Sequence, residues 1–212
     1  MSREVSFKDR FRDLIQEAVK GRRFDGVEIV KVESGYTLDS REVDVTLFMR
    51  GALPFMFIET KRKGREREER KKFDVFAPAV IGQVVSYVFL QKKSNVHVPF
   101  FATANPKLIA VFRTPENIED FVDPQKVEER EYEKVLLPGR LQKLLAKYMV
   151  IGGSLELKKE FFQDILDRLA KDYSKTRILK VELSFALIEQ FRNFVEDVSE
   201  SCRDLVKYKM EN

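Results

Sequence analysis

The chain has 212 residues, of which 43% are hydrophobic and 35% charged, with one His and one Cys. This length suits one globular domain, alone or with a helical appendage. No apolar run reaches the ~18 residues that a membrane-spanning helix needs, so a transmembrane helix is excluded. His97 and Cys202 are too few for a zinc site of His and Cys or for an internal disulfide, so any metal must be held by carboxylates. The net charge of +4 is too small for a bulk polycation, and local clusters of charge matter more.

Composition also bears on source and location. The N-terminus is charged from Arg3 onward and lacks the apolar core of a signal peptide, so we expect a cytoplasmic protein. Abundant Lys and Glu, with five Asn and seven Gln, favour a hyperthermophilic source. An ordinary soluble cytosolic protein is the alternative.

The first half of the chain alternates strands and helices. Ser6 is a plausible cap for a helix over residues 7–18, which Gly21 ends. Strands are then expected at 26–32, 41–48 and 54–61, a helix from Pro78 to about Gln91, and strands at 95–103 and 108–112. This alternation predicts an α/β core over residues 1–115.

Residues 116–212 read as a mainly helical extension. The last helix, at about 183–209, carries apolar residues in steps of four, three, four, four and three, namely Leu187, Phe191, Phe194, Val198, Cys202 and Leu205. Such a narrow seam fits packing on the chain's own core or a homodimer contact.

The strands at 41–48 and 54–61 form a predicted hairpin that gathers charged residues. With its turn centred between Gly51 and Ala52, residues whose numbers sum to 103 lie opposite each other, so Asp44 faces Glu59. Period-2 alternation places Lys61 on the same face. Two facing carboxylates repel unless a cation or proton lies between them, and their oxygens suit Mg²⁺ or Mn²⁺. On spacing alone, the alternative is a pair of solvated strand ends.

These residues resemble the PD-(D/E)xK nucleases, in the branch with Holliday-junction resolvases, RecB-like nucleases and the N-terminal nuclease domain of type I restriction subunits. The matching residues are Asp44 in REVDVTLF, Glu59 and Lys61 in FMFIETKRKG, and Gln83 and Tyr87 in IGQVVSYVFL. The resemblance covers residues 10–113, about half of the chain. It implies a restriction-endonuclease-like core with a mixed central sheet flanked by helices. The length and composition would also suit a nuclease of a spindle-shaped virus of hyperthermophilic archaea, which would act in the host cytoplasm.

The resemblance also implies roles for individual residues. Asp44, Glu59 and the Thr60 carbonyl would bind Mg²⁺ or Mn²⁺, with Glu17 contributing from the first helix, and Lys61 would position the attacking water. Gln83 and Tyr87 lie four apart on one helix face. They would hold Lys61 or a phosphate; a polar pair that only caps strand ends is the alternative.

A basic segment follows Lys61 directly. Residues 62–72 contain seven Lys or Arg and three Glu, and the cations nearest the site are Arg62, Lys63, Arg65 and Arg67. They would bind the DNA backbone and release its counterions, unless the run is simply solvated. The sequence thus predicts a Mg²⁺-dependent deoxyribonuclease that recognises the backbone or structure of duplex or branched DNA. An inactive DNA-binding or assembly module on a nuclease fold is the alternative, and the sequence does not decide DNA against RNA or endonuclease against exonuclease.

Overall fold

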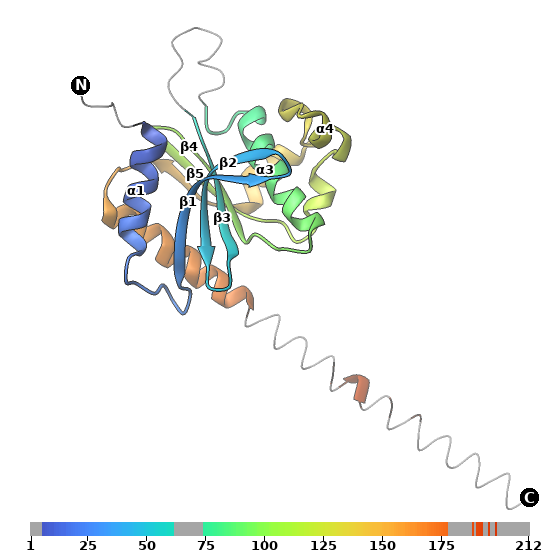
Figure 1. The fold of residues 1–212 in the computed structure, drawn as a ribbon. Helices are drawn as coiled ribbons and strands as arrows, with labels where there is room; N and C mark the ends of the chain where they lie inside the picture. Colours follow the sequence, from blue (N-terminus) through green and yellow to red (C-terminus); the bar gives the residue numbers. More distant parts are fainter. Residues whose placement is uncertain are drawn as a thin grey trace, which may run out of the picture. The chain divides into compact units, whose positions relative to one another are not determined.

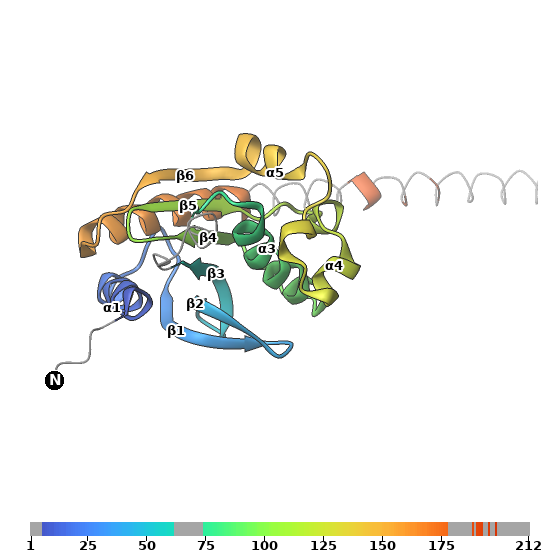
Figure 2. The same cartoon turned by 90° about the horizontal axis from the view of Figure 1, so that it is seen from above.

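The structure is a computed structural model that describes residues 6–61 and 74–177, and residues 188, 190–192, 195 and 198 of the C-terminal segment. The chain forms two compact units, Met1–Ala170 and Lys171–Asn212. The candidate site lies in the first unit, whose elements are drawn in Figures 1 and 2. Within the described residues, no helix combines the length and apolarity needed to cross a membrane.

The first unit is built on a six-stranded sheet whose strand order follows the sequence. The strands are β1 (Ile29–Leu38), β2 (Arg41–Met49), β3 (Leu53–Thr60), β4 (Phe100–Ala104), β5 (Leu108–Arg113) and β6 (Met149–Ser154). Only the β3–β4 pair is parallel among these strands, and α3 (Pro78–Lys93) lies in its crossover connection. In Figure 2, α1 (Phe7–Val19) and α3 lie on opposite sides of the sheet. The predicted α/β class, a mixed sheet flanked by helices, is confirmed.

The β2–β3 hairpin has the predicted register over its central part. Val45 pairs with Ile58 and Leu47 with Met56, so the residue numbers sum to 103. The register shifts by one residue after Leu47, next to a turn in which Gly51 and Ala52 both have positive φ. Asp44 and Glu59 therefore come from adjacent positions of neighbouring strands, at the end of the hairpin away from the turn.

The helix α3 supplies the core on one side of the sheet. Pro78 stands in its first turn, where a missing N–H costs no hydrogen bond. Val84, Val85 and Val88 are fully or almost fully buried, in a cluster with Phe57 of β3 and Phe101 of β4. A helix that is apolar almost all round is held firmly by its neighbours, so its few polar side chains have fixed positions.

Several boundaries expected from the sequence differ in the structure. The strand expected at 95–103 is the shorter β4, which covers Phe100–Ala104. The first strand, expected at 26–32, runs over Ile29–Leu38, because the chain continues in extended form through Gly35 at a positive φ. The first compact unit runs to Ala170, and the division into a core over residues 1–115 and an extension that packs on it stays a prediction. Gly152 and Gly153, expected to break the chain between helices, belong to strand β6. The pairing of β6 with β5 brings the following chain into the unit.

The expected C-terminal seam lies mostly outside the described residues. Of its members, Phe191 and Val198 are described, and both are exposed. Packing on the chain's own core and dimerisation both remain predictions.

Candidate active site

The candidate site lies where β2 and β3 meet the polar face of α3. Asp44 belongs to β2, Glu59 and Thr60 end β3, and Lys61 follows directly, with its N–H bonded to the carbonyl of Ala104 on β4. That bond extends the parallel β3–β4 pairing by one residue. The backbone that carries Glu59 and Lys61 is therefore fixed by strands on both sides.

Glu59 is a buried carboxylate with an unsatisfied oxygen. The residue is 3% exposed, and its Oε1 lies 2.6 Å from Lys61 Nζ. Its Oε2 is buried and has no hydrogen-bond partner in the described part of the chain. Burial, reinforced by the negative charge of Asp44, raises the pKa of Glu59 from 4.5 to about 7. The ionised form needs more positive charge than Lys61 alone supplies.

Asp44 is oriented by hydrogen bonds from the next strand. Its Oδ2 accepts from the backbone N–H and the hydroxyl of Thr60, both at 2.8 Å. Its Oδ1 faces Lys8 Nζ of α1 at 3.3 Å, and the same ammonium lies 2.7 Å from Glu42 Oε1. The pKa of Lys8 is raised above its ordinary value. Burial alone would lower this pKa, but the hydrogen bond to Glu42 and the charge of Asp44 outweigh the effect of burial. Lys8 is thus a site residue that sequence reasoning missed.

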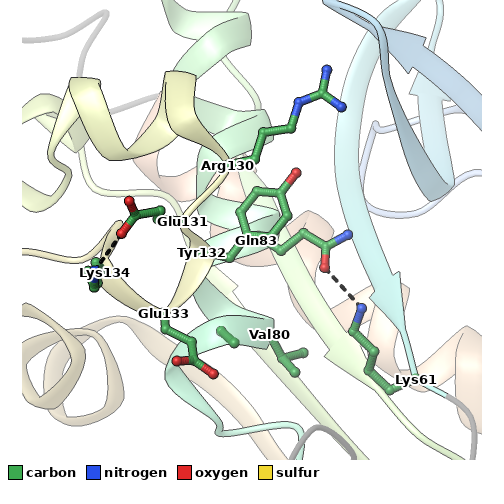
Figure 3. A pocket seen from close by; sticks show the side chains of 9 residues that line it. Lys61, Val80, Gln83, Arg130, Glu131, Tyr132, Glu133 and Lys134 are labelled. Atoms are coloured by element: carbon green, nitrogen blue, oxygen red, sulfur yellow. Dashed lines mark hydrogen bonds and ion pairs between the residues drawn. The ribbon is translucent and has the colours of Figure 1, made fainter.

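A chain of hydrogen bonds connects Lys61 to α3. Lys61 Nζ donates to Gln83 Oε1 at 2.9 Å, drawn in Figure 3, and Gln83 Nε2 donates to the hydroxyl of Tyr87 at 2.8 Å. Burial and the nearby charge of Glu59 raise the pKa of Tyr87, so its phenol stays protonated. The ammonium of Lys61 is therefore held on one side by Glu59 and on the other by Gln83, which Tyr87 holds in turn.

The structure does not bring Glu17 to this cluster. Glu17 is exposed and stands nine residues after Lys8 on α1. At 1.5 Å and 100° per residue, it lies roughly 13.5 Å further along the helix and on the opposite face. The cations Arg62, Lys63, Arg65 and Arg67 lie outside the described residues.

Two carboxylates remain as candidate metal ligands. Within residues 6–61 and 74–177, no three His, Cys, Asp or Glu side chains are close enough to form a metal cluster. The unsatisfied Glu59 Oε2 and the nearby Asp44 nevertheless fit a hard cation that keeps most of its waters, as Mg²⁺ does.

Comparisons with known proteins give little further information. No protein-family model matches the chain, and no curated protein matches it. Among solved structures, the chain is similar to the type IIG restriction endonuclease BpuSI, with 16% sequence identity and a TM-score of 0.46. The similarity covers 78% of this chain and 17% of that protein.

Proposed function

We propose that this chain is a metal-dependent nuclease that hydrolyses phosphodiester bonds in DNA. The observation that carries the proposal is Glu59, a buried carboxylate that shares Lys61 with Gln83 and has one oxygen without a partner among the described residues. Burying such a group without full compensation destabilises a fold, and perturbed carboxylates of this kind concentrate at functional sites. The sequence resemblance to PD-(D/E)xK nucleases supports the same reading.

In this proposal Asp44 and Glu59 hold Mg²⁺ or Mn²⁺, joined by the Thr60 carbonyl that the resemblance implies. A cation held there would supply positive charge beside the phosphate and make a water more acidic. The amide and hydroxyl of Thr60 keep Asp44 from rotating away. Glu17 has no role here, because it lies on the far face of α1 from Lys8.

Lys61 orients the attacking water or a phosphate oxygen. Two of its three ammonium protons are directed at Glu59 and Gln83, so within the described residues one remains for the substrate. Tyr87 fixes the amide of Gln83, and through it the ammonium. The Lys and Arg side chains of the basic segment after Lys61 bind the phosphates of the DNA backbone.

The test is cleavage of a labelled panel of single-stranded, duplex, nicked, forked and four-way-junction DNA with Mg²⁺ or Mn²⁺. Wild type is compared with Lys61→Ala, and with Lys20→Ala as a control lysine at the end of α1, outside the candidate site. We expect cutting by the wild type and the control only. If none of the three cuts but all bind DNA, the chain is instead an inactive binding module.

A further inference from the structure

A cavity of about 540 Å³ adjoins the candidate site. Lys61 and Gln83 line one side of it, and Figure 3 shows the ion pair of Glu131 and Lys134 on the opposite side. A ligand seated there is therefore in contact with the same ammonium that faces Glu59. None of the roles assigned above uses this space.

The cavity is shaped by close packing of Tyr132 on α3. A Cβ added at Gly82 would stand 2.1 Å from the carbonyl oxygen of Tyr132, so only glycine allows this approach. The 3₁₀ helix Tyr132–Lys134 rests on α3 at this point. Because the backbone of Tyr132 is fixed on a buried helix, its half-buried ring is a preformed part of the wall.

The lining combines apolar and aromatic surface with charges of both signs. Ala79, Val80 and Tyr132 supply the apolar part. Arg130, whose guanidinium bonds the Ser40 hydroxyl at 3.0 Å, adds a cation. Glu131 is already paired with Lys126 and Lys134, so Glu133 is the carboxylate of this lining that can accept a hydrogen bond from a ligand. A flat heteroaromatic group with amino donors would stack on the ring of Tyr132 and donate to Glu133.

We propose that this cavity receives an unpaired nucleobase of the DNA strand being cut, next to the scissile phosphate. The inference rests on the proposed nuclease function and specifies its substrate. A base in the cavity stacks on Tyr132 while its phosphate stays near Lys61. Entry requires the base to leave a duplex, at a cost that is smallest in single strands, frayed ends and branch points. The enzyme therefore prefers unpaired DNA over intact duplex.

The test measures binding without cleavage, in EDTA, by fluorescence anisotropy. The probes are a labelled single-stranded DNA 12-mer and a strand of equal length whose central nucleotides are abasic, so that both carry the same phosphates. Wild type should bind the normal strand at least about 5-fold more tightly, the factor that ~1 kcal/mol of stacking gives. Tyr132→Leu should lose this discrimination and Tyr132→Phe should keep it. Tyr148→Leu, which alters a half-buried tyrosine outside the cavity lining, is the control.

The outcomes separate this inference from the function on which it rests. Equal binding of both strands by wild type, together with metal-dependent cutting in the panel, overturns the nucleobase site and leaves the nuclease intact. Discrimination that survives in Tyr132→Leu also overturns it, because the ring would then have no part. If wild type neither binds nor cuts DNA, the proposed function itself fails.

Discussion

Glu59 should destabilise the metal-free protein at neutral and alkaline pH. Its pKa is raised from 4.5 to about 7 by burial and by the charge of Asp44. The folded chain therefore keeps a proton that the unfolded chain releases between these two values. The stabilisation from this group is complete below pH 4.5 and is lost as the pH rises through about 7. At 1.36 kcal/mol per pH unit, the ionised carboxylate lowers the free energy of unfolding by roughly 3 kcal/mol above pH 7.

Glu59→Gln removes this charge and keeps the shape of the side chain. We expect the variant to be more stable than wild type at pH 8 and close to it at pH 5. Relative to wild type, the free energy of unfolding of the variant should be higher at pH 8 than at pH 5 by roughly 2 to 3 kcal/mol. Urea denaturation of both proteins in EDTA at the two pH values measures it. The same variant should lose DNA cleavage, since Glu59 is one of the two proposed metal ligands.

The control for this experiment is Glu42→Gln. The side chain of Glu42 is 62% exposed and pairs with Lys8 on the surface, so its loss should change stability by at most about 1 kcal/mol at either pH. A stability difference between wild type and Glu59→Gln that is the same at pH 5 and pH 8 would refute the reasoning. Adding Mg²⁺ should stabilise wild type and leave Glu59→Gln unchanged, because ligand binding favours only a folded state that can bind it.

Three further predictions concern separate parts of the molecule. Lys61→Ala should reduce single-turnover cleavage by about 100-fold or more, and its urea midpoint should stay near that of wild type at pH 5, where Glu59 is mostly protonated. Gly82→Ala should lower the free energy of unfolding by roughly 1–3 kcal/mol in urea titrations, because the new methyl meets the carbonyl of Tyr132. Neutralising four cations outside the described residues should reduce the salt dependence of duplex binding by a slope of roughly 3 to 4, and an unchanged slope would exclude their contact with phosphates. These four are Arg62, Lys63, Arg65 and Arg67.

The hairpin was predictable because local rules determine it. Polar residues alternate with apolar ones in β2, and the middle of the hairpin has the register expected for a turn between Gly51 and Ala52, although a one-residue shift after Leu47 separates it from the turn. The neighbouring positions of Asp44 and Glu59 therefore follow from the sequence. The spacing of Gln83 and Tyr87 fixes their common helix face in the same way.

The rest depended on tertiary packing that a single sequence does not encode locally. Which side of α1 meets β2 is decided by its buried residues Phe11 and Ile15. That orientation brings Lys8, rather than an acid, to Asp44. The sequence does not show which way the side chain of Glu17, on the same helix, points. Strand β6 escaped prediction because Gly152 and Gly153 are poor strand formers, and only pairing with β5 makes them extended.

Glu59 and Lys61 could be picked out from the sequence because charged residues at the end of a buried strand lower the stability of the fold. Phe55, Phe57 and Ile58 are buried, and a strand of this kind ends favourably in another apolar residue. Glu59 and Lys61 instead place charges at its end, and one oxygen of Glu59 has no partner in the part of the chain that the structure describes. Local rules favour an apolar residue at that position. A charged residue there conflicts with these rules, and this conflict indicates a functional site in the sequence. The nucleobase cavity carries no such conflict, because its wall comes from the backbone path around Tyr132. It is therefore visible only once α3 and residues 130–134 have been placed side by side.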